Sequence, residues 1–296
     1  MIKARRIGHA TFDTHDLDRL SDHYTNVIGL VVAARDKDRV YLASKLGHLA
    51  VELRRATGGA CRKLSFEIAS DISLADAEKD LAKHGIRSER SNDPAPGIAN
   101  TLTFTDPKGT QVELFTAWNT LADGQSPKGI GIQKLGHVAY FTTDVKKTME
   151  FYATVMGFKV SDWIGDFFVF MRCNPDHHTV NFMHDDNDNR LHHIAFQLDG
   201  WDQMKTACDV LGRHNVELAW GPVRHGPGHN IAVYHRNPDD HIIELFCDLD
   251  TMIDEELGYF EPKPWHRDNP QRPKVWEPGP SVNIWGPPPS EAFRRK

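Results

Sequence analysis

The sequence contains few cysteines and no long apolar segment. Only 4 of its 296 residues are cysteines, and none of them has the paired spacing that binds metals or builds a disulfide framework. No segment approaches the roughly 18 consecutive apolar residues of a membrane-spanning helix, and the first residues lack the apolar centre of a signal peptide. We therefore expect reduced thiols, a cytoplasmic location and no membrane partner.

The sequence also lacks a large excess of charge of one sign. It has 35 Lys and Arg against 41 Asp and Glu, a formal net charge of -6, and no run of like charges, so we expect no nucleic-acid partner. Histidine, by contrast, is abundant, and 11 of the 17 histidines lie between His137 and His241. Because histidine is a common metal ligand and a proton carrier near neutral pH, we expect the functional site in this interval.

The two halves of the sequence repeat one another. Residues 7–32 align without gaps with residues 135–160, and the two segments share a Gly-His pair near their start. The similarity returns where TDPKGTQVELF, ending at Phe115, matches RNPDDHIIELF, ending at Phe246. A repeat of this length predicts two copies of one domain.

Each copy has the pattern of an α+β fold. In the second copy, residues 137–143 alternate like a strand, Asp144 can cap a helix that runs to Met156, and Gly157 ends it. Short strands follow and the unit then recurs, which predicts βαβββ modules, paired in each domain as an open barrel. The expected segments are an N-terminal domain (1–118), a linker (119–131), a C-terminal domain (132–248) and an extended proline-rich arm (249–296).

Three residues of the second copy have the composition of a metal site. His137 lies in the first strand of one module, His193 opens the equivalent strand of the next, and Glu244 lies on the closing strand. Two histidines and one carboxylate can occupy one face of an octahedron and leave three positions open, as in non-haem Fe(II) oxygenases. The sequence therefore predicts a mononuclear Fe(II) site, and Mn(II) remains an alternative for the same ligands.

The first copy retains only part of this set. His9 and Glu113 stand at the places of His137 and Glu244, but Lys63 stands at the place of His193. A lysine cation would repel a divalent metal. We therefore expect the N-terminal domain to be non-catalytic.

The segment VRHGPGHNIAVYHRNPDDHIIE, residues 223–244, resembles the signature of the type I extradiol dioxygenases of the vicinal oxygen chelate, or glyoxalase/bleomycin resistance, superfamily. The matching residues are His225, Tyr234, Pro238 and Glu244, whereas Asp240 departs from the usual Gly or Pro, a change we expect to affect only the turn. The resemblance implies a vicinal oxygen chelate fold and an enzyme that cleaves a catecholic ring with O2 in aromatic compound degradation.

The resemblance also assigns roles to residues. It implies that His178, in NPDHHTV, is an acid on the side of the pocket where O2 binds, and that His225 and Tyr234 hydrogen-bond the catechol and help to deprotonate it. The N-terminal copy has Leu49, Pro94 and Thr103 at these three places. A homo-oligomer, a tetramer or larger, is a further implication.

The residues expected to line the pocket are the only indication of which catechol is the substrate. Phe170, with Phe167 and Phe168, is expected to contact an aromatic ring, and Trp220 and the C-terminal arm with Arg272 are expected to close the pocket. In relatives that act on carboxylated catechols, an arginine aligns with Trp220. We therefore expect an apolar, larger or substituted catechol.

Two other classes of protein fit the same fold. A glyoxalase-like isomerase or lyase would usually use four metal ligands, whereas three fall together here. A non-enzymatic binding protein resembling the bleomycin-resistance proteins would need no metal ligands. Bound metal and catechol-dependent oxygen consumption distinguish the three.

Overall fold

The computed structural model describes residues 1–121, 128–261, 271–279 and 282–294. Most of the regular structure is β-sheet with a few short helices, so the predicted α+β class is confirmed. The helices are α1 (Leu17–Asp22), the π-helix η1 (His23–Ile28), α2 (Leu74–Lys83), α3 (Val145–Thr154), α4 (Trp201–Arg213) and α5 (Glu291–Arg294).

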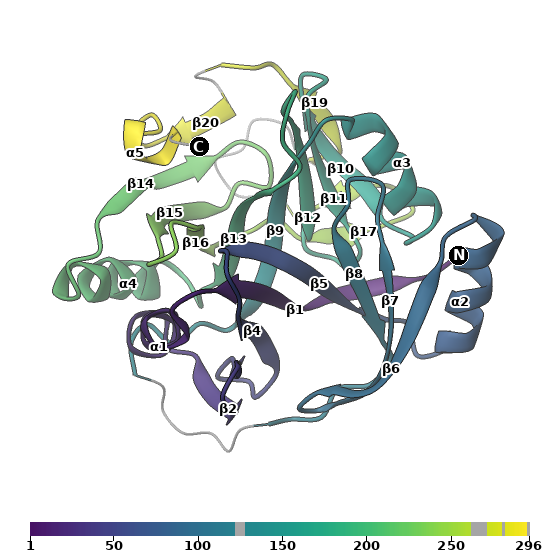
Figure 1. Ribbon diagram of the computed structural model, residues 1–296. Helices are drawn as coiled ribbons and strands as arrows, with labels where there is room; N and C mark the ends of the chain where they lie inside the picture. The colour runs from purple at the N-terminus through teal and green to yellow at the C-terminus, as the bar shows by residue number, and fades with distance from the viewer. Residues whose placement is uncertain (122–127, 262–270, 280–281, 295–296) are drawn as a thin grey trace.

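Two large sheets organise the chain, the first in purple and blue and the second mainly in teal and green in Figure 1. The first contains β1 (Ala4–Thr14), β2 (Val31–Arg35), β3 (Arg39–Ala43), β4 (Leu49–Arg55), β5 (Ala60–Ile68), β6 (Ser88–Ala95), β7 (Ile98–Thr105) and β8 (Gln111–Phe115). The second contains β9 (Lys134–Thr142), β10 (Lys159–Ile164), β11 (Phe168–Arg172), β12 (Val180–His184), β13 (Leu191–Gln197), β14 (Leu218–His225), β15 (Ile231–Arg236), β16 (Ile242–Cys247), β19 (Lys274–Trp276) and β20 (Asn283–Trp285).

The two sheets have the same internal strand order. The first runs β2-β3-β4-β1-β5-β8-β7-β6, and the second contains β10-β11-β12-β9-β13-β16-β15-β14. In both, the two central strands are antiparallel, and each pairs in parallel with the last strand of its own module. The sequence repeat is therefore a repeat of topology. The residue boundaries given above for the two domains, the linker and the arm remain predictions.

Helix α3 illustrates how local sequence sets an element. The side chain of Asp144 accepts a hydrogen bond from the backbone N–H of Lys147 at 2.9 Å, as an N-cap should. The helix ends at Thr154, two residues before the predicted end at Met156. Gly157 follows with φ +79°, the left-handed conformation that ends helices.

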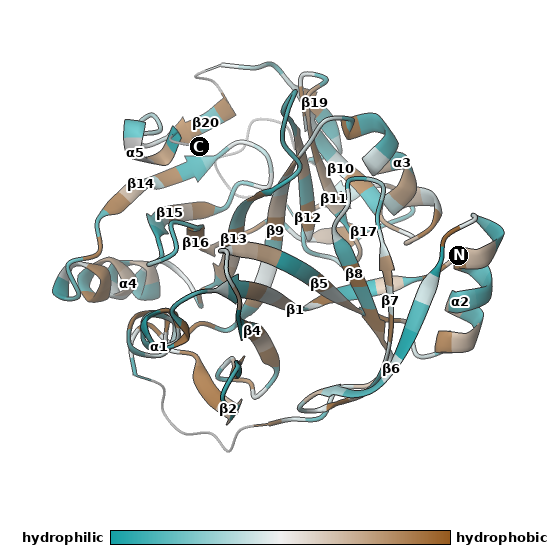
Figure 2. Cartoon of the chain, viewed as in Figure 1, coloured by the Kyte–Doolittle hydropathy of each residue, from teal (hydrophilic) through white to brown (hydrophobic). Residues whose placement is uncertain are grey.

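The two halves share one apolar core. The ring of Phe66 lies 5.5 Å from that of Phe158, and the ring of Tyr24 lies 6.3 Å from that of Phe196. All four side chains are buried. Figure 2 shows hydrophilic residues along the edge strand β6, as expected for a strand that presents unpaired backbone groups.

The C-terminal arm adds strands to the second sheet at both edges. β19 pairs with β10 at one edge and β20 pairs with β14 at the other, while β17 (Met252–Asp254) and β18 (Tyr259–Phe260) form a separate hairpin. The arm is therefore not simply extended. Residues 262–270, 280–281 and 295–296 of the predicted arm, and residues 122–127 of the predicted linker, lie outside the described residues.

None of the helices in the described residues is long and apolar enough to cross a membrane.

Candidate metal and catalytic site

Glycine precedes the first histidine of each copy for a packing reason. A Cβ atom at Gly136 would lie 2.4 Å from the ring of Phe246, and one at Gly8 would lie 2.4 Å from the ring of Phe115. Glycine therefore lets the phenylalanine of the closing strand pack against the first strand, where the Phe246 ring lies 4.8 Å from the His137 ring. The glycine of the Gly-His motif and the phenylalanine of the Glu-Leu-Phe motif therefore pack against each other in both copies.

Three adjacent strands bring together the predicted metal ligands. Ala195 of β13 pairs in register with His137 of β9 on one side and with Glu244 of β16 on the other. His193 lies two residues before Ala195, the spacing that places side chains on the same face of a strand. Each of His137, His193 and Glu244 is buried and offers one ligand atom, and these atoms lie within 4.8 Å of one another.

The electrostatics of this cluster favour a bound cation. Oε2 of Glu244 lies 3.2 Å from Nε2 of His137 and 3.1 Å from Nε2 of His193. Burial raises the pKa of Glu244, but the two histidines outweigh this and hold the pKa well below its usual value. Burial also lowers the pKa of His137. An ionised carboxylate and a neutral imidazole are the forms that bind metals.

In the first copy, a lysine occupies the equivalent place. Lys63 Nζ lies 2.7 Å from Oε2 of Glu113, and the hydroxyl of Ser65 donates to the other carboxylate oxygen. Nε2 of His9 lies 3.5 Å from Oε1 of Glu113. The ammonium group thus neutralises the buried carboxylate inside the chain, and no metal is needed there.

The predicted proton-handling groups of strands β14 and β15 lie together beside the ligands. Nε2 of His225 lies 2.8 Å from the hydroxyl of Tyr234, and Nδ1 of His225 lies 2.9 Å from Oδ1 of Asn283. Burial lowers the pKa of His225 and, with the charge of Glu244, raises that of Tyr234 well above its usual value. At neutral pH, His225 can accept the Tyr234 proton at Nε2 while it donates from Nδ1 to Asn283.

His178 lies on the other side of the cluster. Its ring centroid is 4.3 Å from that of His137 and 5.3 Å from that of Phe170. Burial, with neighbouring His137 and His177, lowers the pKa of His178 well below its usual value.

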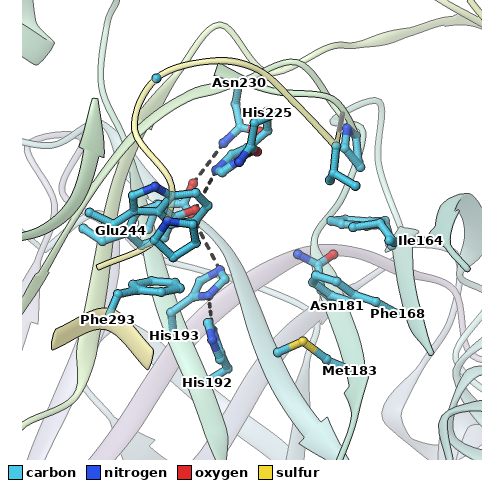
Figure 3. Close-up of a pocket in the computed structure, with 18 of the residues that line it drawn as sticks. Ile164, Phe168, Asn181, Met183, His192, His193, His225, Asn230, Glu244 and Phe293 are labelled. Carbon is cyan, nitrogen blue, oxygen red and sulfur yellow. Dashed lines mark hydrogen bonds and ion pairs between the residues drawn. The ribbon is translucent and has the colours of Figure 1, made fainter. Parts of the chain in front are cut away.

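These groups line one cavity of about 830 Å³. Figure 3 shows Glu244, His193 and His225 on one side, and Ile164, Phe168 and Met183 across from them. The other apolar lining residues include Phe167, Phe170, Trp220, Trp285 and Phe293. The cavity is thus polar at the histidine and glutamate cluster and mainly apolar elsewhere.

Of the three residues expected to contact substrate, Phe170 and Trp220 line the cavity, and Trp220 stacks on Tyr234 with ring centroids 5.0 Å apart. Arg272 is not among the lining residues, so its expected role in closing the pocket is corrected. Its exposed side chain instead lies 4.4 Å over the ring of Tyr259 and donates to the Tyr259 hydroxyl. Part of the arm does line the cavity, through residues 278–279, 282–289 and 293–294.

Sequence reasoning missed two asparagines that support the site. Asn230 Nδ2 donates to Oε1 of Glu244 at 2.9 Å, and Asn283 accepts from His225. Asn230 lies inside the segment that carried the family resemblance, so its position was a usable signal. Asn283 lies in the arm, far from any motif, and nothing in the sequence indicated its contact.

The family model for the Glyoxalase/Bleomycin resistance protein/Dioxygenase superfamily matches residues 134–245. A manganese-dependent 2,3-dihydroxybiphenyl 1,2-dioxygenase from Geobacillus genomosp. 3 is 30% identical, with 95% of this chain and 96% of the relative covered. A metapyrocatechase from a Pseudomonas strain is 25% identical, with 86% and 92% covered.

Solved structures are also similar to this chain over nearly its whole length. Homoprotocatechuate 2,3-dioxygenase from Brevibacterium fuscum, in complex with 3,4-dihydroxyphenylacetate, matches with a TM-score of 0.84 at 25% identity, over 99% of this chain and 92% of the other. A Mn(II)-bound glyoxalase from Novosphingobium aromaticivorans matches with a TM-score of 0.80 at 23% identity, over 97% and 94%. The second likeness shows the fold alone.

Proposed function

This chain belongs to the extradiol ring-cleavage dioxygenases of the glyoxalase/bleomycin resistance/dioxygenase superfamily, and we propose that it cleaves an apolar-substituted catechol with O2, using a divalent metal bound by His137, His193 and Glu244. The observation that carries the proposal is the convergence of these three buried ligand atoms in a cavity with apolar walls.

The donor set fits a divalent metal. Nε2 of His193 is buried and makes no hydrogen bond of normal geometry among the described residues, although it lies 3.1 Å from Oε2 of Glu244. Two imidazoles and one hard carboxylate suit Fe(II), and Mn(II) is compatible with the same ligands. A bound metal would supply a Lewis acid that holds the two catechol oxygens and O2 together.

The protein's own groups then manage protons. Tyr234 can hydrogen-bond a catechol oxygen and pass a proton to Nε2 of His225, which lies 2.8 Å away. His178, on the side of Phe170, can hold or donate a proton from its ring. These roles are supported by the separate positions of the two groups around the metal ligands.

The cavity walls support an apolar substituent on the catechol. Aromatic and aliphatic side chains of the second sheet and of the arm form most of the lining, and Arg294 is the one cationic side chain among the lining residues that are described. Trp220 contacts Tyr234 and Phe293, so it covers the proton-handling pair with apolar surface. A homo-oligomeric assembly and a cytoplasmic location remain predictions.

The test is metal analysis followed by anaerobic addition of a catechol and then air. A dioxygenase should bind about one Fe(II) or Mn(II) per chain, consume oxygen only with catechol present, and give a yellow ring-fission product. In a panel of catechols, those with aryl or alkyl substituents should have a higher kcat/KM than 3,4-dihydroxyphenylacetate. A metal-loaded protein that consumes no oxygen with any catechol, or that isomerises a thiol adduct instead, would contradict the proposal.

A further inference from the structure

A chain of hydrogen bonds runs from His178 away from the cavity. Nδ1 of His178 lies 3.0 Å from Nδ1 of His177, and Nε2 of His177 lies 3.1 Å from Oδ2 of Asp162. The three residues are 3%, 0% and 2% exposed. His177 and Asp162 are not among the residues that line the cavity, whereas His178, which His177 contacts, is one of them.

Asp162 is held in place by the C-terminal arm. Its Oδ1 accepts from the backbone N–H of Lys274 at 2.8 Å, and its Oδ2 accepts from Nε1 of Trp276 at 2.7 Å. Both donors belong to β19, which pairs with β10 beside it (Figure 1). The carboxylate therefore accepts from two donors of the arm, and its Oδ2 also lies within hydrogen-bond distance of Nε2 of His177.

His177 is also fixed by packing. Its ring lies 4.8 Å from the ring of Phe260, and a Cβ atom at Gly228 would come within 3.0 Å of its Nδ1. Gly228 has φ +73°, so a side chain there would be strained as well as crowded. The ring thus has little freedom to turn away from His178.

The direction of these hydrogen bonds follows from the chemistry of the groups. An ionised carboxylate can only accept, so Nε2 of His177 carries a hydrogen. In the neutral form of this ring, Nδ1 is then an acceptor. The contact between the two Nδ1 atoms then requires that Nδ1 of His178 carries the hydrogen. We propose that Asp162 and His177 are positioning residues that fix the orientation and tautomer of His178, with its free Nε2 left for the cavity.

This inference rests on the proposed function, in which His178 exchanges a proton with the bound molecule. A neutral His178 of this tautomer meets the substrate as a proton acceptor at Nε2. It donates only a proton that it has first taken up there. In many enzymes a carboxylate fixes the tautomer of a catalytic histidine by direct hydrogen bonding. Here the imidazole of His177 lies between the carboxylate of Asp162 and His178.

The experiment is a double-mutant cycle between His177 and His178, measured on the metal-loaded enzyme. His177→Phe keeps ring shape and removes both nitrogens. We expect unchanged metal content, an anaerobic catechol Kd within about two-fold of wild type, and a fall in kcat of roughly 10 to 100-fold. In the His178→Phe background, the same substitution should change kcat by less than about two-fold, because the two residues act as one unit.

The repeat offers a matched control. His48 stands at the place of His177 in the first copy, where its ring stacks 4.5 Å from that of Trp118, so His48→Phe should leave kcat unchanged. If His177→Phe folds poorly, Asp162→Asn is the second variant. We expect it to lower kcat when His178 is present and to have little effect in the His178→Phe background. Equal losses in both backgrounds, or wild-type kcat in the single variants, would overturn the inference. A wild type that does not act on catechols would overturn the proposed function as well.

Discussion

At the scale of single residues, the internal repeat provides equivalent glutamates with opposite roles. Glu244 lies between two histidines, whereas Glu113 lies 2.7 Å from the Lys63 ammonium group. The same carboxylate therefore faces an expected metal in one copy and an internal cation in the other. The two copies can serve as controls for each other.

We expect Glu244→Ala, like His137→Ala and His193→Ala, to remove both stoichiometric metal and activity, because a three-ligand site has no spare donor. Glu113→Ala should keep metal and activity but lower stability, because it leaves a largely buried lysine without its nearest partner. Metal analysis and thermal unfolding measure the two effects. Loss of metal from the Glu113 variant would show that the first copy contributes to the metal site.

Tyr234→Phe removes one hydroxyl with little change in volume. The hydroxyl lies 2.8 Å from Nε2 of His225, so its loss should lower kcat by roughly 10 to 100-fold, because it removes one positioned proton-handling group while His225 remains. Metal content should not change. Turnover at the wild-type rate would exclude Tyr234 from proton transfer.

His178→Phe separates binding from chemistry. Because His178 is not a metal ligand in this arrangement, the variant should retain metal and bind catechol anaerobically within a few-fold of wild type. Its kcat should fall by about 100-fold or more, as for loss of a general acid. His178→Asn should retain part of the rate by hydrogen bonding. A His178 variant that lost its metal would identify this residue as a ligand instead.

At the scale of elements, the arm forms a wall of the site. Its residues 282–289 and Phe293 line the cavity, and Trp220 Nε1 donates to the carbonyl of Pro287 at 2.8 Å. The metal ligands, by contrast, lie on β9, β13 and β16, which pair with one another without the arm. This wall of the cavity and the three candidate metal ligands therefore come from different elements.

A chain shortened to end at Gly279 lacks β20 and α5. We expect KM for an aryl-substituted catechol to rise roughly tenfold or more, about 1.4 kcal/mol of lost binding, while metal content stays the same. Asn283→Ala is the finer variant and should lower kcat more than it raises KM, because Asn283 contacts His225. Unchanged KM in the shortened chain would show that this wall does not contact substrate.

At the scale of the whole molecule, a buried histidine pair joins the two halves. His23 of η1 and His235 of β15 lie with their Nε2 atoms 3.3 Å apart, and both are buried. Burial lowers the pKa of His23 from 6.5 to about 4, and burial together with His23 lowers that of His235 further. Both rings are therefore neutral in the folded chain at pH 7.

This pair predicts a loss of stability in acid. Between pH 6.5 and about 4 the unfolded chain binds protons that the folded chain does not, so the free energy of unfolding falls as pH falls. The contribution of His23 is about 3 kcal/mol at most, from a shift of that size. Urea unfolding across this range should show a smaller pH dependence for His23→Gln, with His15→Gln as the surface control. An equal slope in the two variants would contradict the assignment.

The sequence by itself determined the repeat, the fold class and the residue types of the metal site. These follow from local patterns: strand alternation, helix caps, and a Gly-His pair and a Glu-Leu-Phe segment that recur in both copies. The comparison of copies also identified Lys63 as the exception in the first. Such features are set by residues near one another in the chain or by equivalence between the copies.

Only the tertiary structure decided which side chains support the site. Asn283 reaches His225 from 58 residues away, and Asp162 reaches His177 from a separate strand held by β19. Arg272, expected at the pocket, lies instead against Tyr259. Contacts of this kind depend on how the arm pairs with both edges of the second sheet. The polar residues of the arm show no strand or helix periodicity, so strand pairing and packing determine what they contact.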